Sequence, residues 1–311
     1  MDHKQFLASL SPEQCRDLTE TSDPRGLAQL ALHLGAILLL GGLIVARVPF
    51  WPALMLPQGI LLVFLFTLLH EASHATPFRS RWLNAAAAHL SGSLILLPPR
   101  WFRYFHFAHH RFTHLPGKDP ELDAPKPETW GQYVLHVSGI PVWISHVRTL
   151  ARNASGRYAD RFVPEAKRGA VRTEAQAMLG IYLALILGSL ALATPVLLFV
   201  WLIPLALGQP FLRLYLLAEH GRCPHVSNML ENSRTTLTNA LVRRLAWNMP
   251  YHAEHHSYPT VPFHRLPDLH RLAEAHLKVT ENGYARFHAK YAPGMAGAER
   301  VGEIPITRSM P

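Results

Sequence analysis

Cysteine is scarce in this chain, which has only Cys15 and Cys223 among its 311 residues. Two thiols cannot build a disulfide framework. They also cannot supply the cysteine ligands of a structural zinc or an iron–sulfur cluster. We therefore expect both to be plain thiols, and any metal site must use other ligands.

Charge is absent from three long stretches. Leu27–Ala46 and Val48–Leu69 hold no Asp, Glu, Lys or Arg, and Ala175–Leu212 holds none over 38 residues, with a natural break at Thr194-Pro195. About 20 residues of helix, at 1.5 Å each, cross the roughly 30 Å hydrocarbon core of a bilayer. Helices of a soluble core are rarely so long and so apolar on every side. The sequence predicts an all-α polytopic membrane protein with two transmembrane hairpins and a cytoplasmic helical cap, with four spans at about 27–47, 50–70, 175–193 and 196–216.

The N-terminal residues lack the pattern of a cleavable signal peptide. Met1–Arg25 is polar and charged, and the first apolar stretch is too long and too far along the chain to be a signal core. We expect a cytoplasmic N-terminal segment over 1–26, a single membrane domain over 27–291, and an irregular tail over 292–311.

The positive charge has no nucleic-acid pattern. The net charge is +9, but no basic run with interleaved aromatic residues occurs, so we expect no nucleic-acid partner. Arg and Lys gather between Arg79 and Arg172 and again after Arg243, as expected of cytoplasmic loops. We therefore expect an integral protein of a bacterial inner membrane, with both termini and the active site on the cytoplasmic side. The same charge could dock an acidic electron-transfer protein.

Histidine is abundant, and eight of the 20 histidines form three motifs. These are His70-Glu71-Ala72-Ser73-His74, His106-Phe107-Ala108-His109-His110 and His252-Ala253-Glu254-His255-His256. Spacings of three and four residues place side chains on one helix face. Imidazole ligates iron, zinc, copper and nickel, and about four ligands satisfy one zinc ion. Eight histidines therefore indicate two ions.

A shared metal site constrains the topology. The three motifs meet on one side of the membrane only if Leu83–Pro98 does not cross it, and this segment is short for a span and carries a histidine and two serines. We interpret it as a re-entrant or interfacial helix. Gln132–Val147 likewise resembles a helix lying at the interface.

Two other classes of protein remain alternatives at this point. His70-Glu71-x-x-His74 is the pattern of a zinc protease, with the glutamate as general base. That function leaves most of the other histidines without a role. A metal transporter would need ionisable groups inside the spans, and only His33 is available there.

The three motifs on a four-span protein resemble those of the membrane fatty acid desaturase and hydroxylase superfamily, which also includes carotenoid ketolases and hydroxylases. The resemblance covers roughly Leu62 to His270, with the boxes HEASHATPF, HFAHHRFTHLPGKDPE and NMPYHAEHHSYPTVPFHRLP. It implies a non-haem centre of two iron ions that activates O2 and removes hydrogen from an unactivated C–H bond. The implied ligands are His70, His74, His106, His109, His110, His220, His252, His255 and His256.

Residues around the boxes are candidates for supporting roles. We expect Glu71 and Glu254 to orient the ligand rings and share the charge of the ions. Further candidates are Glu219, Asp119 and His114. Asn248 lies four residues before His252, and we place it on the same helix face, as a ligand, a hydrogen-bond donor or a cap.

The resemblance leaves the substrate open. We expect desaturation of a fatty acyl or other lipidic chain, taken from the lipid bilayer. The alternatives are hydroxylation or ketolation of a carotenoid or other apolar substrate, decarboxylation of a fatty acid to a terminal alkene, and desaturation of a small polar metabolite. Ser73 stands where glycine is frequent in acyl-lipid desaturases. No His-Pro-Gly-Gly occurs, so electrons must come from a separate donor of the ferredoxin, rubredoxin or cytochrome b5 type.

Overall fold

The computed structural model describes residues 1–158 and 160–295, and nearly all of the regular structure in them is helical. The α-helices are α1 His3–Ser9, α2 Pro12–Leu18, α3 Asp23–Val45, α4 Trp51–His74, α5 Arg81–Leu94, α6 Pro99–Phe112, α7 Trp130–Ser138, α8 Ile140–Ser155, α9 Arg168–Ala191, α10 Ile203–His220, α11 Met229–Asn232, α12 Ala240–Leu245, α13 His252–Ser257, α14 Leu266–Ala273 and α15 Tyr284–Tyr291. The 3-10 segments are Pro120–Asp123, Glu165–Lys167, Glu274–His276 and Ala292–Gly294, and Leu198–Leu202 is a π-helical segment, η3. Strands β1 Thr235–Leu237 and β2 Thr280–Asn282 pair in parallel, with Thr235 opposite Thr280.

Four helical stretches are long and apolar enough to cross a membrane, which confirms the predicted fold class. They contain α3, α4, α9, and η3 continued by α10. The break between α9 and η3 includes Thr194 and Pro195, as predicted. Apolar side chains on these helices face outward: Leu38 on α3 is 74% exposed and Leu190 on α9 is 71% exposed. Such exposure is costly in water and favourable in lipid.

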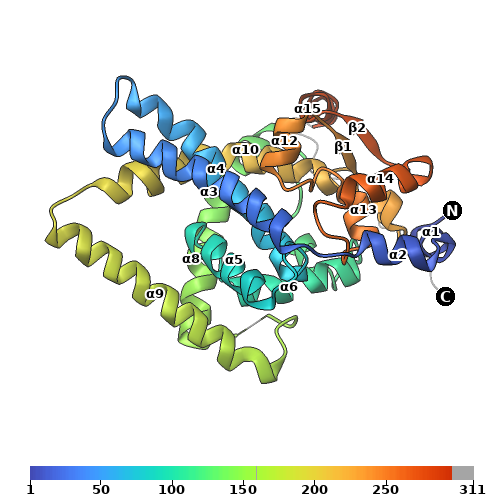
Figure 1. The fold of residues 1–311 in the computed structure, drawn as a ribbon, viewed down its shortest axis with the longest axis horizontal. Helices are drawn as coiled ribbons and strands as arrows, with labels where there is room; N and C mark the ends of the chain where they lie inside the picture. Colours follow the sequence, from blue (N-terminus) through green and yellow to red (C-terminus); the bar gives the residue numbers. More distant parts are fainter. Residues whose placement is uncertain (159, 296–311) are drawn as a thin grey trace.

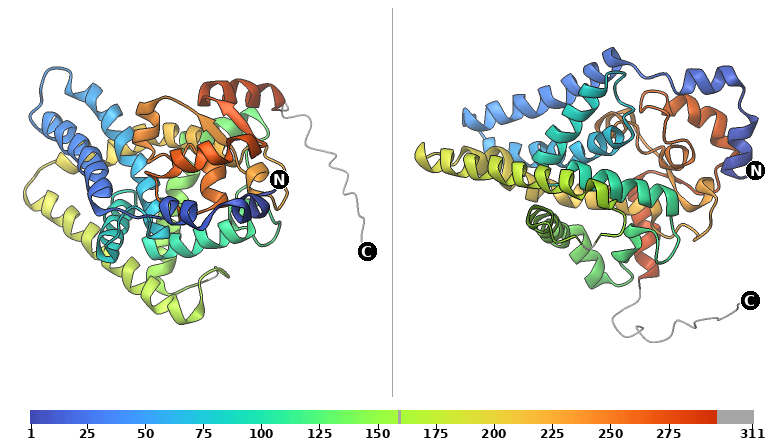
Figure 2. Two further views of the ribbon diagram at one scale, coloured as in Figure 1. Left: turned by 45° about the vertical axis from the view of Figure 1, so that its right-hand side comes forward. Right: turned by 90° about the horizontal axis from the view of Figure 1, so that it is seen from below.

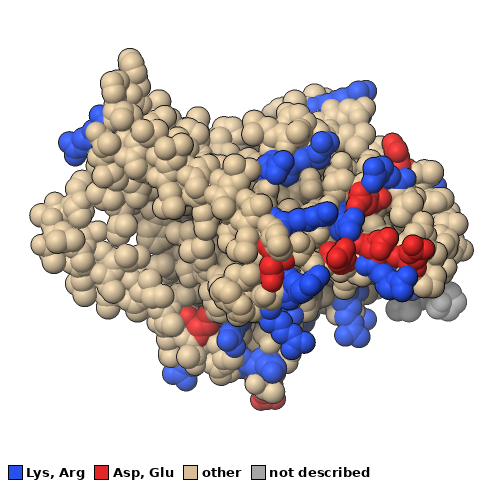
Figure 3. All heavy atoms as spheres, in the orientation of Figure 1, with Lys and Arg blue, Asp and Glu red and all other residues tan. Residues whose placement is uncertain are grey.

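The two hairpins point in the same direction. The turn between α3 and α4 and the turn between α9 and η3 both lie at the left of Figure 1, and the other views agree (Figure 2). Helices α1, α2 and α12–α15 and the two strands gather at the opposite end, and α5, α6 and α8 lie between (Figure 1). Charged side chains on the face drawn in Figure 3 concentrate at that end, and the hairpin region is almost free of them. The helix ends that carry His74 and His220 therefore emerge on one side.

Helix α4 is the centre of the membrane part, and it crosses α10 at two glycines. A Cβ atom on Gly59 would lie 1.9 Å from the carbonyl oxygen of Pro204, and one on Gly208 would lie 2.2 Å from the backbone of Gly59. The absence of both side chains lets the two backbones touch. This crossing fixes α4 against α10, and each helix ends in a histidine of the candidate site.

The two uncertain segments of the sequence have different outcomes. The segment 83–98 falls in α5, a helix of 14 residues that is not among the four membrane-length stretches. The prediction of a single helix over Gln132–Val147 is wrong, because this segment forms parts of two helices, α7 and α8. The helix is interrupted at Gly139, which has a φ of +72°. Gly139 packs so closely on Gln209 that a Cβ atom on the glycine would lie 2.2 Å from the Gln209 side chain. A helical periodicity does not reveal such a break.

The tail beyond the last helix is described only in part. Ala292–Gly294 forms a 3-10 turn after α15, and the rest of the predicted irregular tail, 296–311, lies outside the described residues. The two N-terminal helices, α1 and α2, lie on the predicted 1–26 segment, and α1 contacts α13 and α2 contacts α14.

Candidate metal centre

Histidines from four helices converge at the end of the membrane part where the charged residues gather. His70 and His74 occupy the last turns of α4, and His220 is the last residue of α10. The second motif lies on the C-terminal half of α6, and the third forms most of α13. Helix α13 is buried over its whole length, because the helices and strands at this end of the molecule cover it.

The first group of histidines joins α4, α6 and α13. Ring nitrogens of its five members all lie within 4.8 Å of one another. The Nε2 atoms of His74 and His106 are 2.7 Å apart. The members are His70, His74, His106, His110 and His255. So close a set of imidazoles could hold a metal ion.

The second group joins α6, α10 and α13. His109, His220 and His256 have ring nitrogens within 4.8 Å of one another. The Nε2 atom of His220 lies 3.1 Å from that of His109 and 2.9 Å from that of His252, which adds His252 to this group. The two groups are contiguous, because the rings of His110 and His256 stack with centroids 4.1 Å apart.

Helix geometry divides each HxxHH motif between the two groups. Neighbouring residues on an α-helix point about 100° apart, since there are 3.6 residues per turn. On α6, His110 therefore faces the first group and His109 the second; on α13, His255 faces the first group and His256 the second. In each motif, the two adjacent histidines therefore belong to different groups.

Several ring nitrogens are buried without a hydrogen-bond partner. Among the described residues, neither ring nitrogen of His70, His110 or His255 has a partner, and Nε2 of His256 also lacks one. A buried polar atom left unpaired costs about 1–3 kcal/mol. Repeated unpaired nitrogens that face one another fit the ligands of a metal ion.

The electrostatics keep most of these rings neutral. Burial lowers the pKa of His106, His110, His255 and His256 well below the ordinary value, and neighbouring imidazoles lower it further. Neutral imidazole is the form that binds a metal. For His109 burial acts in the same direction, but the carboxylates of Glu121 and Asp119 reverse the shift and raise its pKa.

Three rings of the second group have a polar neighbour at Nδ1, on the side of the ring that faces away from the group. His109 Nδ1 lies 3.0 Å from an oxygen of Asp119, and His220 Nδ1 lies 3.1 Å from the carbonyl oxygen of Asn232. His252 Nδ1 lies 3.4 Å from the Glu219 carboxylate but has no hydrogen-bond partner among the described residues. Each contact leaves Nε2 free to face the group, as is usual for metal-binding histidines. Among the predicted supporting residues, Asp119 thus contacts a ring of the second group directly, and Glu219 lies near one without a hydrogen bond.

A substitution of Asp119 is the clearest test of this arrangement. It is fully buried, and it also accepts hydrogen bonds from the backbone of His114 and Glu121. We expect Asp119→Asn to weaken the binding of the second metal ion by about 10- to 100-fold, because the amide is a poorer acceptor for His109. Titration with a competing chelator measures this change. Asp123→Asn is the matched control, since the Asp123 side chain is 71% exposed, and equal affinity in the two variants would contradict the role of Asp119.

The two glutamates inside the motifs differ. Glu71 accepts hydrogen bonds from Thr76 and from the backbone of Phe263, and its other oxygen lies 4.0 Å from His255 Nδ1. Glu254 does not contact the ligand rings, contrary to the expectation. It binds Thr235 and His270 instead, because its position on α13 directs it to the face opposite the three histidines.

Two further candidates lie away from the rings' nitrogens. His114 hydrogen-bonds the carbonyl oxygen of Pro224, and its ring centroid lies 5.2 Å from that of His220, so it borders the second group without joining it. The placement of Asn248 on one helix face with His252 is wrong. Asn248 lies in a turn before α13, with a φ of +58°, and donates a hydrogen bond to the carbonyl oxygen of Phe263.

Sequence reasoning missed Glu121. One of its oxygens lies 3.3 Å from His109 Nε2, and the other is paired with Lys126. Despite burial, which raises it, Lys126, His109 and His220 hold the pKa of Glu121 well below its usual value. Its only sequence signal is a position two residues after Asp119, and a loop conformation cannot be derived from that spacing. His270 is hydrogen-bonded to Glu254, on the side of α13 that faces away from the histidine groups.

Aromatic rings border the first group. Phe102 stacks on His106 with centroids 5.4 Å apart and contacts Phe66, and Phe107 lies 5.5 Å from His74. Trp101 and Phe105 contact Phe162 instead. The side of the centre toward α4 and α6 is therefore partly walled by apolar surface.

Comparison with known proteins gives one family and several relatives. The family profile described as fatty acid desaturase matches residues 46–289, most of the chain. An sn-1 acyl-lipid omega-3 desaturase (ferredoxin) of Nostoc is 29% identical over 30% of this chain and 29% of its own length. Dihydrorhizobitoxine desaturase of Bradyrhizobium elkanii is 23% identical over 76% of this chain and 71% of its length. Fatty acid conjugase FAC2 B of Calendula officinalis is 23% identical over 68% and 64%. The match thus spans under a third of the first of these relatives and about two thirds of the other two.

Proposed function

Because the chain belongs to the fatty acid desaturase family, we propose that it is an O2-dependent oxidoreductase that desaturates a fatty acyl or other lipidic chain. The observation that supports this most is the pair of adjoining histidine groups, with mostly neutral rings and several unpaired nitrogens, at the end of two membrane-length helices. A zinc protease would use His70 and His74 with one further ligand. That function gives no role to the rest of the first group or to the second.

Two iron ions fit the donor set. His70, His74, His106, His110 and His255 would hold one ion, and His109, His220, His252 and His256 the other. Imidazole nitrogen suits non-haem iron. Iron bound there would supply the activation of O2 and the removal of hydrogen from a C–H bond.

The protein's own contribution is orientation and exclusion of water. Hydrogen bonds to Asp119 and to the Asn232 carbonyl oxygen fix the orientations of His109 and His220 in the second group. The carboxylate of Glu71, fully buried beside His255, offsets part of the positive charge. Burial of α13 keeps bulk water from the reacting centre, and Phe66, Phe102 and Phe107 offer apolar surface to a chain entering from the bilayer.

The relatives support two substrate classes. Two of the three are named for acyl lipids or fatty acids, which favours an acyl chain. The name of the Bradyrhizobium relative specifies dihydrorhizobitoxine instead, and that match covers 76% of this chain. Desaturation of such a non-acyl metabolite is therefore the second candidate.

The electron donor and the orientation are part of the proposal. The name of the Nostoc relative includes ferredoxin, which favours a ferredoxin over rubredoxin or cytochrome b5 as the separate donor. We place the protein in a bacterial inner membrane with the histidine groups and both termini on the cytoplasmic side, where Arg and Lys concentrate.

Product analysis tests the proposed reaction. Purified protein in lipid vesicles is supplied with ferredoxin, its reductase, NADPH and O2, and the lipids are examined by mass spectrometry. We expect an acyl product 2 Da lighter than its precursor, formed only with O2 and the donor. A product 16 Da heavier would indicate hydroxylation, and turnover of dihydrorhizobitoxine alone would favour the second candidate. No oxygen-dependent product in any assay would contradict the proposal.

A further inference from the structure

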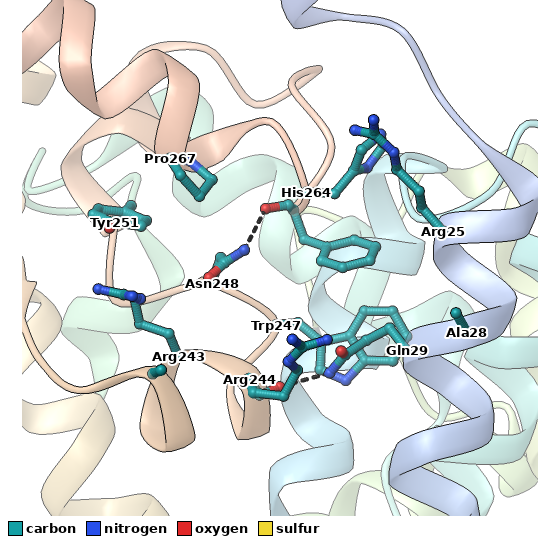
Figure 4. A pocket seen from close by; sticks show the side chains of 12 residues that line it. Arg25, Ala28, Gln29, Arg243, Arg244, Trp247, Asn248, Tyr251, His264 and Pro267 are labelled. Carbon is teal, nitrogen blue, oxygen red and sulfur yellow. Dashed lines mark hydrogen bonds between the residues drawn. The ribbon is translucent and has the colours of Figure 1, made fainter.

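A cavity of about 410 Å³ lies between the start of α3 and the segment that leads into α13. This volume is within the roughly 300–1,000 Å³ typical of small-molecule sites. Arg25 enters it from α3, Arg243 and Arg244 from α12, and Trp247, Tyr251 and Phe263 complete most of the wall (Figure 4). None of the nine histidines of the metal centre lines it.

The three arginines carry positive charge without a carboxylate partner. Within the described residues, none of them lies within ion-pair distance of an acidic side chain. The acids near the cavity are already paired: Arg265 binds both Glu20 and Asp268, at 3.0 and 3.2 Å. Arg243 donates to the carbonyl oxygen of Thr238, which leaves its charge uncompensated. The cavity is therefore electropositive.

The positive charge also affects the pKa of a neighbouring histidine, His264. His264 also lines the cavity, and burial together with Arg25 and Arg265 lowers its pKa to about 4. It therefore stays neutral near pH 7. Guanidinium groups reach the cavity from two sides, Arg25 from α3 and Arg243 and Arg244 from α12 (Figure 4), and each is a strong donor to a carboxylate or phosphate.

The inner surface of the cavity is apolar and well fixed. Trp247 is fully buried, donates a hydrogen bond to His33 of α3, and contacts Phe263 with centroids 4.8 Å apart. Gln29 of α3 donates to the carbonyl oxygen of Arg244, which ties α12 to the first membrane helix. A ligand with a charged head and an apolar body matches this combination of a cationic rim and a wall of ring edges from Tyr251 and Phe263, which are 7% and 6% exposed.

The cavity also lies at the membrane boundary. Arg25 stands two residues before the uncharged stretch that begins at Leu27, so its side chain is at the depth of lipid head groups. Its opposite wall is close to the metal centre, since Tyr251 precedes His252 and the backbone of Phe263 donates to Glu71.

We propose that this cavity binds a membrane amphiphile by its anionic head group, a carboxylate or a phosphate, with Arg243 and Arg244 of α12 on one side and Arg25 of α3 on the facing side supplying the positive charge. The inference rests on the cavity and on the membrane position of α3, and it does not depend on the proposed oxidation. The head group could belong to a fatty acid or to a phospholipid, and the chemistry of recognition is the same.

Binding of defined amphiphiles by the full chain tests the proposal. The chain in a neutral maltoside detergent is titrated with oleate, with phosphatidylglycerol, with oleyl alcohol and with inorganic phosphate, and native mass spectrometry counts the bound molecules. We expect one oleate or one phosphatidylglycerol per chain, at least tenfold tighter than oleyl alcohol. The preference between the first two identifies the source of the head group.

Variants locate the site. R243Q/R244Q should weaken binding of the anionic amphiphile at least tenfold and leave that of oleyl alcohol unchanged. R271Q/R286Q removes the same charge from residues whose side chains are 75% and 60% exposed outside the cavity, and should have no effect. Ala28→Trp fills the cavity without altering charge and should also block binding, provided that gel filtration shows folded protein.

Three results would overturn the proposal. These are equal binding by R243Q/R244Q and the unaltered chain, saturation by inorganic phosphate with no amphiphile bound, and retention of an acidic ferredoxin through these arginines without any lipid.

Discussion

His255→Ala is expected to lower the rate of oxidation by more than about 100-fold, since a change in a residue behind a ligand already costs about 10- to 100-fold. The His255 ring is fully buried, and its centroid lies 4.6, 4.8 and 4.9 Å from those of His70, His74 and His110. It is thus the contribution of α13 to the first group. Its removal should release the first metal ion.

The same variant should still fold. Neither ring nitrogen of His255 has a hydrogen-bond partner among the described residues, so alanine leaves no protein donor or acceptor unpaired. Turnover, iron content and detergent gel filtration are measured together. The control is His225→Ala, which removes an exposed histidine near His114 and should keep full activity. An active, iron-loaded His255→Ala protein would contradict the assignment.

Gly59→Ala should destabilise the protein although the same exchange usually stabilises a helix. Alanine is favoured over glycine inside a helix by about 0.5–1 kcal/mol. At Gly59, however, the new methyl group would meet the backbone of Pro204 at 1.9 Å and that of Gly208 at 2.9 Å. Backbone atoms cannot move aside as a flexible side chain can, so α4 and α10 must separate, at a cost of about 1–3 kcal/mol or more.

Gly35→Ala on α3 is the matched control. A Cβ atom there has nothing within 4 Å, so this variant should be as stable as the unaltered protein or slightly more stable. The midpoint of thermal unfolding in detergent should fall for Gly59→Ala and hold or rise for Gly35→Ala. Because the crossing positions His74 against His220, iron content should fall with Gly59→Ala alone. Parallel behaviour of the two variants would contradict the close helix crossing.

The membrane helices could be predicted because absence of charge over a whole span is a local property. The helix bounds follow it closely: the second predicted span, 50–70, corresponds to α4 at Trp51–His74. The break at Gly139 depends on the contact with Gln209, which is 70 positions distant in the sequence, and no local pattern contains it.

The ligand types could be predicted, but their grouping could not. Spacing shows that His106, His109 and His110 share a region of helix surface. Which of them faces α4 and which faces α10 depends on the rotation of α6 within the fold. Asn248 was misplaced for a related reason: a turn with positive φ interrupts the helix that the spacing alone suggested.

The positions of the acidic residues around the site could likewise be predicted only in part. Asp119 hydrogen-bonds His109 and Glu71 lies 4.0 Å from His255, whereas Glu254 points away and Glu121 takes a place beside His109. The direction of Glu254 follows from helix geometry, since its position on α13 is opposite the three histidines, whereas the place of Glu121 does not. Glu121 lies in the 3-10 turn after α6, whose path is set by the buried hydrogen bonds of Asp119.

The metal content of the purified protein is the most direct test of the central claim. The chain is loaded with ferrous iron without oxygen, freed of unbound metal, and examined by elemental analysis against the protein concentration. We expect about two iron ions per chain, falling to about one in His255→Ala. A single tightly bound zinc ion, or no metal retained by folded protein, would contradict it.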